Sequence, residues 1–347
     1  MKKFVKKIIL NFALPIFCCL SLIIYWDPFK VFQSYSEYFH NNNIPLNREN
    51  VCLNLLKKRE GNISNFIIGS SRSHAYKTEK WCSKINQPQN TVFHYDGSEL
   101  GLYRATNAIK YLSQRYKIKN ILLITDEWFF RETKMPLNHL FIQPTTVSKE
   151  NSLFFYLTFI KSAVSFKFIF SNLVYKLTGK HYAFMDKYLN KVGPYKSSYD
   201  NFTGDVWYGA DSEIKADSLL YYSKRNSEGI FKRKKNTGIS KSKSLIKAPQ
   251  EKYLMDLQSI IKTNKINIKI IISPLFSQRK LNEEDKNILK NIFGKENIFD
   301  FSGKNSITEN IFNYYEASHY RPHVANQIMD SIYSTTSKSN LTRQSLN

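Results

Sequence analysis

Three side chains near opposite ends of the chain could together perform nucleophilic catalysis. Ser71 follows an apolar run and a glycine, and His319 lies three residues after Glu316. A serine hydroxyl is a poor nucleophile until an imidazole accepts its proton, and the imidazole needs a carboxylate to hold its tautomer. A carboxylate and a histidine three residues apart can project to the same side of a turn or helix start. The pattern indicates nucleophilic catalysis with Ser71 as nucleophile, His319 as base and Glu316 as its orienting partner.

Each half of this pattern also has a structural interpretation. Gly69-Ser70-Ser71 after a strand is often an ordinary turn with a helix N-cap. A single histidine such as His319 is commonly a surface residue with satisfied hydrogen bonds. Only the combination of a serine at a strand end with a Glu-x-x-His pair favours catalysis.

The elements that must position these residues form an alternating series. Short runs rich in Ile, Leu and Val predict buried strands at 65–68, 121–125 and 268–272, with a weaker strand at 91–95 and a helix at 102–114. Alternation of strands and helices predicts an α/β domain of three layers, with a parallel central sheet between helices. Because ligands bind at the carboxyl ends of parallel strands, Ser71 would face the ligand side.

The N-terminus predicts a membrane anchor. Residues 8–26 are 19 residues without a charged side chain, long enough to cross a hydrocarbon core of about 30 Å. Lys2, Lys3, Lys6 and Lys7 precede this stretch and Asp27 follows it. By the positive-inside rule, the N-terminus would lie in the cytoplasm and the rest of the chain outside it. A cleaved signal peptide and a buried core helix are the alternatives; residues 25–28 offer no small-x-small cleavage pattern.

The remaining segments are assigned by composition. Residues 27–50 indicate a juxtamembrane connector, 51–334 the catalytic domain and 335–347 a flexible tail. Within the domain, the apolar and aromatic stretch 151–177 contains lysines, and predicts amphipathic helices that cover the sheet or rest on a membrane surface. Nine Lys or Arg residues against one acid in 224–247 predict a mobile basic loop.

Charge and cysteine content narrow the class of function. A formal net charge of +23 favours anionic partners such as lipid headgroups or acidic cell-surface polymers, although most of these lysines are expected to be solvated surface charge. No nucleic-acid motif is present, so nucleic acid is not the expected partner. Cys52 and Cys82 could form a disulfide outside the cytoplasm or remain free buried thiols. No metal-binding pattern occurs, and neither a metal nor another cofactor is expected.

The motifs and their order resemble the SGNH (GDSL-type) hydrolase superfamily, in particular membrane-anchored bacterial members resembling alginate O-acetyltransferase and D-alanyl-transfer proteins. The resemblance spans residues 26–330 and rests on short blocks: Ile68-Gly69-Ser70-Ser71-Arg72, Tyr95-Asp96-Gly97-Ser98, Leu123-Ile124-Thr125-Asp126, Ile271-Ile272-Ser273-Pro274 and Glu316-Ala317-Ser318-His319, with Trp26-Asp27-Pro28-Phe29 after the anchor. It implies a flavodoxin-like catalytic domain.

Carried over by residue, the resemblance implies that the backbone N–H groups of Ser71 and Gly97 hold the oxyanion. Ser70, Arg72 and Asp126 would be neighbours of the site. The chain departs from the family pattern in three places: Ser70 replaces the usual Asp, Asp126 stands where an Asn normally supplies a third oxyanion donor, and Glu316 replaces Asp. An ionised Asp126 would oppose an oxyanion, and the loss of one donor typically raises the barrier by about 3 to 4 kcal/mol.

Two classes of function follow. The resemblance implies an extracytoplasmic serine esterase or O-acyl (acetyl) transferase that acts on an anionic or neutral cell-surface polysaccharide, with a multispanning acyl-donor protein as a possible partner. The alternative is a catalytically silent relative that binds polysaccharide or takes part in envelope assembly. An esterase acting on the nearby bilayer is a third interpretation, without a motif of its own.

Overall fold

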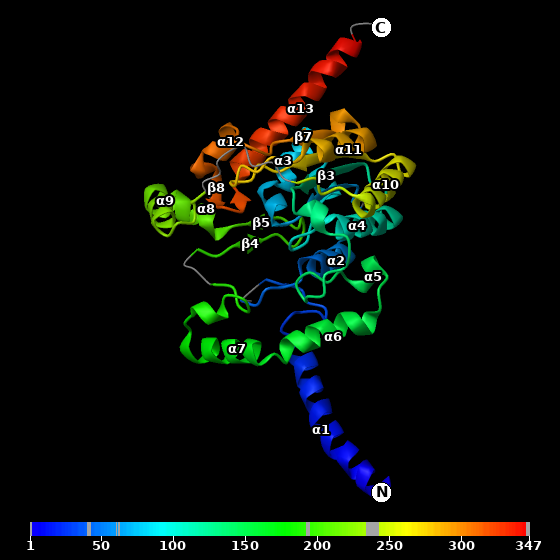
Figure 1. Ribbon diagram of the computed structural model, residues 1–347, viewed down its shortest axis with the longest axis vertical. Coiled ribbons are helices and arrows are strands. Elements are labelled where there is room, and N and C mark those ends of the chain that lie inside the picture. Colours follow the sequence, from blue (N-terminus) through cyan, green and yellow to red (C-terminus); the bar gives the residue numbers. More distant parts are fainter. Residues whose placement is uncertain are drawn as a thin grey trace.

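The protein is described from a computed structural model, which covers residues 2–39, 43–59, 61, 63–191, 195–233 and 243–344. Of residues 2–12, 16 and 335–344 only the backbone is described. Figure 1 shows an α/β domain with helix α1 (Lys2–Trp26) projecting from one end and helix α13 (Pro322–Gln344) projecting from the other.

The centre of the domain is a sheet of five parallel strands. They are β1 (Asn65–Gly69), β2 (Val92–Asp96), β3 (Asn120–Thr125), β6 (Asn267–Ile272) and β7 (Ile298–Asp300), in the spatial order β2-β1-β3-β6-β7. The sequence therefore correctly predicted four of these strands and their parallel pairing. In this order the chain reverses direction across the sheet between β1 and β3, and ligands of such folds bind in the crevice at that point.

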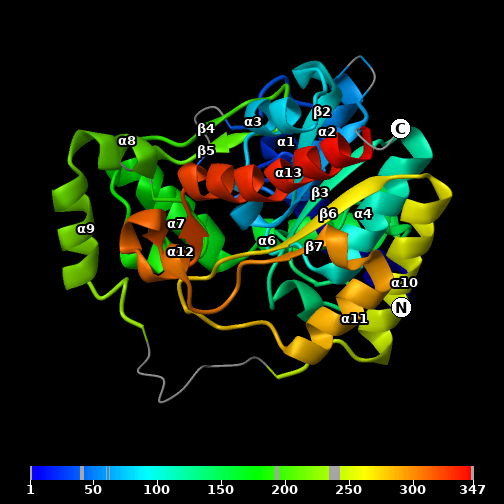
Figure 2. The same cartoon turned by 90° about the horizontal axis from the view of Figure 1, so that it is seen from above.

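Alternate residues of the strands supply two hydrophobic cores. Phe66 and Ile68 of β1 face one core, and Ile67 faces the other. The first core is covered by α2 (Arg48–Lys58), α4 (Leu102–Arg115), α10 (Ala248–Thr263) and α11 (Glu283–Phe293). The second is covered by α3 (Thr78–Lys84), α8 (Gly209–Ala216), α9 (Ser218–Ser227) and α13. Figure 2 shows α13 and α3 on one side of the strands and α4, α10 and α11 on the other, which gives three layers.

Short elements complete the domain. Two antiparallel pairs flank the sheet: β4 (Ser198–Tyr199) with β5 (Val206–Trp207), and β8 (Tyr314–Glu316) with β9 (His319–Tyr320). The short α-helices are α5 (Thr145–Ser148) and α12 (Ser306–Glu309). The 3₁₀ turns are η1 (Ser71–Ala75), η2 (Gln89–Thr91), η3 (Phe129–Arg131), η4 (Ala183–Met185), η5 (Lys295–Asn297) and η6 (Ile311–Asn313).

The connector after α1 is ordered by one buried carboxylate. Asp27 accepts hydrogen bonds from the backbone N–H groups of Val31, Phe32 and Gln33 at 2.9, 2.9 and 3.0 Å, and from the hydroxyl of Tyr35 at 3.0 Å. The Asp27 N–H itself donates to the last turn of α1. The turn that follows α1 is therefore a compact, hydrogen-bonded unit.

Helices α6 (Ser152–Ala163) and α7 (Phe166–Thr178) do not cover the sheet, contrary to one of the two sequence-based expectations. They lie across the end of the domain from which α1 projects (Figure 1) and pack with it in a third hydrophobic cluster that includes Ile23, Phe29 and Phe159. They cannot cover the sheet because the layers on both of its faces are already filled by other helices.

Two further segments qualify the sequence-based assignments. Of the expected basic loop 224–247, residues 234–242 lie outside the described residues, and 224–227 belong to α9. The expected tail from residue 335 continues α13 as far as Gln344. Cys52 and Cys82 are both buried and unbridged.

Over the residues that can be assessed, no single helix is both long and apolar enough to span a bilayer. The bent pair α6 and α7, 52° apart, passes that test together by length and composition. The side chains of 2–12, which belong to the expected span 8–26 and its basic flank, lie outside the described part.

Candidate active site

The candidate nucleophile Ser71 is positioned by strand β1, which ends close to β3. β1 ends at Gly69, and η1 begins at Ser71. A Cβ at Gly69 would lie 2.8 Å from the Ser73 Cβ and 3.0 Å from that of Ile124, so only glycine allows the chain to turn this close to β3. Ser71 consequently sits at the carboxyl end of β1, at the crevice between β1 and β3. Its N–H opens the 3₁₀ turn, where a helical N–H has no partner within the helix.

The structure brings the three predicted catalytic side chains together. Nε2 of His319 lies 2.7 Å from Oγ of Ser71, and Nδ1 of His319 hydrogen-bonds Oε1 of Glu316. The other carboxylate oxygen of Glu316 accepts the Ser318 N–H at 2.7 Å. The tight β8–β9 hairpin, rather than a helix start, places Glu316 and His319 side by side. The arrangement has the hydrogen-bond order of a Ser-His-acid triad.

The triad carboxylate is held in its ionised form. Burial alone would raise the pKa of Glu316, but the hydrogen bond and charge of His319, helped by the Ser318 N–H, outweigh it, so the pKa lies below its usual value. An ionised Glu316 accepts the Nδ1 proton of His319. Nε2 is then free to accept a proton from Ser71, which is the tautomer that general-base catalysis needs.

Asp126 forms an ion pair with Arg72, the residue after the nucleophile, through Oδ2. Its Oδ1 accepts the N–H groups of Trp128 and Phe129 at 2.7 and 3.2 Å, and Arg72 also donates to the Ser318 carbonyl at 3.2 Å. The negative charge that was expected to oppose an oxyanion is thus compensated by an adjacent guanidinium. Arg72 in turn ties the nucleophile turn to the hairpin that carries His319.

Gly97 is not placed as the sequence predicted. Its N–H donates to the Gly69 carbonyl at 3.1 Å, and its Cα packs against the side chain of Glu49. It is also not among the residues that line the cavity at Ser71. In this geometry the Gly97 N–H is engaged by the sheet and does not face an acyl group on Ser71. The N–H of Ser71 is the remaining member of the predicted oxyanion pair.

A cavity of about 610 Å³ opens beside the nucleophile. Such a volume suits a ligand of the size of a few sugar rings or a small ester with its leaving group. It is lined by Ser70, Ser71, Arg72, Glu99, Leu100, Asp126, Trp128, Phe129, Arg131, Glu132, Ser318 and His319. The predicted site neighbours therefore share one cavity with the nucleophile and the base.

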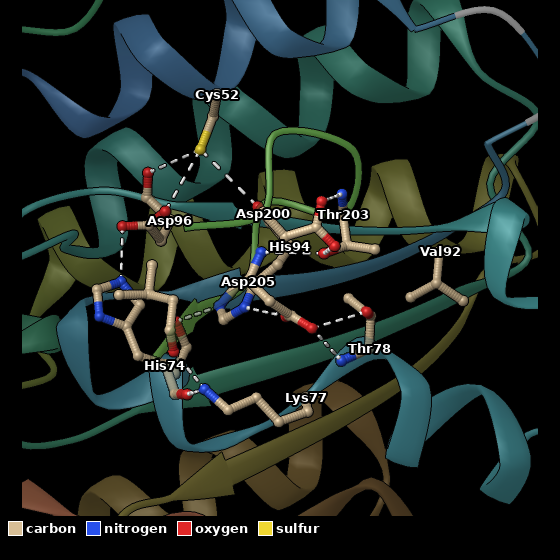
Figure 3. Close-up of polar contacts among 12 residues, drawn as sticks. Cys52, His74, Lys77, Thr78, Val92, His94, Asp96, Asp200, Thr203 and Asp205 are labelled. Atoms are coloured by element: carbon tan, nitrogen blue, oxygen red, sulfur yellow. Dashed lines mark hydrogen bonds and ion pairs between the residues drawn. The ribbon is translucent and has the colours of Figure 1, made fainter. Parts of the chain in front are cut away.

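A buried polar network behind the site was not predicted from the sequence. His74 hydrogen-bonds Asp96 at 2.9 Å, and Asp96 also accepts two hydrogen bonds from Arg48 and one from the Cys52 thiol. Figure 3 shows Cys52 and His74 converging on Asp96. Burial, opposed by Asp96, lowers the pKa of His74 to about 4, whereas Arg48 and His74 overcome the burial of Asp96 and hold its pKa well below the usual value.

Tyr208 links this network to the triad. Its hydroxyl lies 2.9 Å from Nδ1 of His74 and 3.4 Å from the Ser71 carbonyl, and its ring centroid is 5.5 Å from that of His319. Tyr208 therefore supports the nucleophile turn and one side of the catalytic imidazole. The sequence signals for the network were His94 within the expected strand 91–95 and Asp96 in the block that follows it, neither of which indicates its partners.

A second Ser-His-Asp arrangement lies inside the domain. Ser73 contacts Nε2 of His94 at 2.8 Å, Nδ1 of His94 contacts Asp205 at 3.2 Å, and Thr78 donates twice to Asp205. Figure 3 shows His94, Asp205 and Thr78 side by side. The Ser73 and His94 residues have no exposed surface, so no ester can reach them, and the hydroxyl of Ser73 donates to the Ser70 carbonyl at 2.7 Å. This arrangement stabilises the nucleophile turn.

Among the residues described, no group of three or more His, Cys, Asp or Glu side chains could hold a metal ion. No family model matches the chain, and neither a curated protein nor a solved structure matches it. The function is therefore argued from the geometry of the site.

Proposed function

We propose that the protein is a membrane-anchored, extracytoplasmic serine esterase or O-acyl (acetyl) transferase of the SGNH kind, acting on a cell-surface polysaccharide. The observation that carries the proposal is the hydrogen-bonded series Ser71, His319 and Glu316 at the mouth of a cavity. The parallel sheet supports it, since the serine follows β1 at the carboxyl edge where such folds bind ligands.

The geometry supports a two-step reaction. His319 takes the proton of Ser71 through Nε2 while Oγ attacks the acyl carbonyl, and the N–H of Ser71 donates to the developing oxyanion. His319 then returns the proton to the leaving oxygen, which gives an acyl-Ser71 intermediate. In the second step His319 deprotonates water or a saccharide hydroxyl, which attacks the acyl carbonyl. As the bond from the acyl carbon to Oγ of Ser71 breaks, His319 returns the proton to Oγ and the free serine is restored. Water completes hydrolysis, and a hydroxyl completes transfer.

The end of the domain around α1 supports a location at a membrane. In the described part of α1, Leu14, Phe17 and Leu22 each expose more than 60% of their surface. On α6 and α7, apolar side chains including Leu157, Phe166 and Leu173 are exposed, and three lysines are interspersed with them: Lys161, Lys167 and Lys176. Apolar and cationic side chains on one helical layer suit the interface of a bilayer with anionic headgroups.

A multispanning partner is part of the transferase form of the proposal. Activated acyl donors are made in the cytoplasm, so an extracytoplasmic transferase needs a protein that passes the acyl group across the membrane. An esterase would work without it.

The alternative, a catalytically silent polysaccharide-binding or envelope-assembly protein, is favoured by one observation. The N–H of Gly97 is engaged with Gly69, and Asp126 offers no donor, so two of the three oxyanion donors typical of the family are absent from the cavity. The intact triad opposes this alternative. A binding protein has no need for a serine, a histidine and a glutamate in this order.

The decisive experiment uses the full chain in detergent or lipid nanodiscs. Wild type should react with a fluorophosphonate probe at Ser71, as mapped by mass spectrometry, and should hydrolyse an activated acetyl ester. Ser71→Ala should lose both properties, and His319→Ala should lose at least about 100-fold in kcat. If wild type neither labels nor hydrolyses above the Ser71→Ala background, the silent alternative replaces the enzyme.

A further inference from the structure

The cavity at Ser71 contains one exposed aromatic side chain. Trp128 exposes 54% of its surface, while the other two apolar lining residues, Leu100 and Phe129, are buried. Ligand pockets combine aromatic side chains with a few polar groups that orient the ligand, and Trp is enriched at such partly wet positions. An indole that is more than half exposed at the cavity is available to a ligand and adds little to the core. Trp128 therefore has no role in the core that would account for its position.

Several contacts fix the position of Trp128 relative to the nucleophile. Its backbone N–H donates to Oδ1 of Asp126, and the other carboxylate oxygen of Asp126 pairs with Arg72, next to Ser71. The Trp128 carbonyl accepts the Arg131 N–H at 3.1 Å, and the Arg131 guanidinium carbon lies 4.0 Å from the indole centroid. Asp126, which departs from the family pattern as an oxyanion donor, thus connects the backbone of Trp128 to the turn that carries Ser71.

The surroundings of Trp128 are charged rather than apolar. Glu99 and Arg131 are exposed at the same cavity, and Glu99 keeps a left-handed backbone with a φ of 48° that non-glycine residues rarely adopt. A long acyl chain would find no continuous apolar surface here. A sugar ring presents C–H groups on one face and hydroxyls at its edge, so it can pack on an indole while it donates to carboxylates and accepts from a guanidinium.

We propose that Trp128, with Arg131 against its ring and Glu99 at the same cavity, is a saccharide-binding subsite that holds one sugar ring of the polymer next to Ser71. This inference rests on the proposed function for the position of the reacting acyl group, but not for the binding itself. Trp128 is assigned here as a specificity-determining residue, since it contacts the saccharide and not the acyl carbonyl.

The first test is binding, in full-length protein that carries Ser71→Ala and is therefore unable to turn over. The probes are xylohexaose, cellohexaose and a mannuronate hexasaccharide, followed by saturation-transfer NMR and tryptophan fluorescence. At least one probe should bind, and Trp128→Ala should weaken its affinity about tenfold or more, since a half-exposed indole would lose roughly 100 Å² of contact. The control is Trp207→Ala, which removes a tryptophan that is 39% exposed and lies outside the cavity.

The second test is selectivity. O-acetylated xylohexaose and an activated acetyl ester are compared as substrates, and Trp128→Ala should lower the ratio of their kcat/KM values about tenfold, mainly through KM for the saccharide. Trp128→Phe should restore part of the lost ratio between the two kcat/KM values. The proposal is overturned if no hexasaccharide binds, if Trp128→Ala and Trp207→Ala bind alike, or if both esters lose activity equally. Binding that depends on Trp128 without any ester turnover would keep the subsite and reject the enzymatic proposal.

Discussion

At the scale of single residues, the pairing of Arg72 with Asp126 determines how much negative charge the cavity at Ser71 carries. Asp126 is almost fully buried, and its carboxylate has one cationic partner in the salt bridges of the described chain. Removing one partner of a buried pair leaves an uncompensated charge, which costs more than the pair contributes. In the proposed enzyme the ion pair would therefore neutralise the charge of Asp126 near the oxyanion, in addition to linking the turn at Ser71 to the β8–β9 hairpin.

A double-mutant cycle tests this neutralisation. Arg72→Ala should lower kcat/KM for an activated acetyl ester, because the unpaired Asp126 carboxylate then opposes the oxyanion on Ser71. Adding Asp126→Asn should recover part of the loss, with a coupling free energy of about 1–3 kcal/mol. Strict additivity of the two changes would show that the charges do not act together. Thermal unfolding of each variant controls for loss of fold.

His74 predicts a pH dependence of stability. Its pKa is lowered from 6.5 to about 4 in the folded protein, chiefly by burial. Above pH 6.5 the imidazole of His74 is neutral in both the folded and the unfolded protein, so its titration does not lower the free energy of unfolding. Between pH 6.5 and 4 the unfolded chain binds the proton and the folded chain does not, so stability falls on acidification, by at most about 3 kcal/mol.

The measurement is the unfolding midpoint of wild type and His74→Gln between pH 7.5 and 4. The variant is expected to be less stable at pH 7.5 and to lose less on acidification. If His74→Gln loses as much stability between pH 7.5 and 4 as wild type does, the loss is caused by the titration of another group. His139, whose pKa burial also lowers to about 4, is the first candidate, and His139→Gln is the matched comparison.

At the scale of elements, η1 carries serines that belong to two Ser-His-acid arrangements, and burial separates their roles. Ser71 faces the cavity, whereas Ser73 points into the domain toward His94. The two positions differ by two residues on a 3₁₀ turn of three residues per turn, so they face different directions.

Substitution of each serine should separate activity from stability. Ser71→Ala should abolish ester hydrolysis with little change in unfolding. Ser73→Ala should retain hydrolysis but destabilise the protein by about 1–3 kcal/mol, since it leaves polar groups of His94 and of the Ser70 carbonyl unpaired. Loss of activity in Ser73→Ala with unchanged stability would mean that the inner arrangement takes part in catalysis.

Much of this architecture is predictable because its signals are local. The strands β1, β3 and β6 are continuous apolar runs, and Glu316 and His319 are close in sequence, so their proximity follows from the chain itself. The network of Arg48, His74 and Tyr208 is not predictable, because it joins single polar residues from separate elements and has no period. The oxyanion role expected for Gly97 did not anticipate its hydrogen bond to Gly69, because that partner is set by the register of the sheet.

At the scale of the whole molecule, α6 and α7 form a layer between α1 and the α/β domain (Figure 1). Its exposed apolar and lysine side chains are expected to lie in the headgroup region of a bilayer. The nucleophile would then be held at the far side of this layer, above the membrane surface.

Site-directed fluorescence can test this position in the full chain reconstituted in nanodiscs. Cys18 and Cys19 are exposed and are first changed to serine, whereas Cys52 and Cys82 are buried. A dye at Leu173→Cys on α7 should be quenched by lipids that carry a spin label near the headgroup. A dye at Leu219→Cys on α9, which is also exposed, should not be quenched. Equal quenching at the two positions would contradict the proposed orientation.

The carboxylate of Asp27 orders the junction between α1 and the domain. It ties the end of α1 to the turn that enters the domain, so in the proposed membrane-anchored enzyme Ser71 would be held at a nearly constant height above the bilayer. An enzyme held at one height meets a growing polymer only during the interval in which a given sugar passes that height. The spacing of acyl groups along the polymer would then record the ratio between the rate of export and the rate of turnover at Ser71.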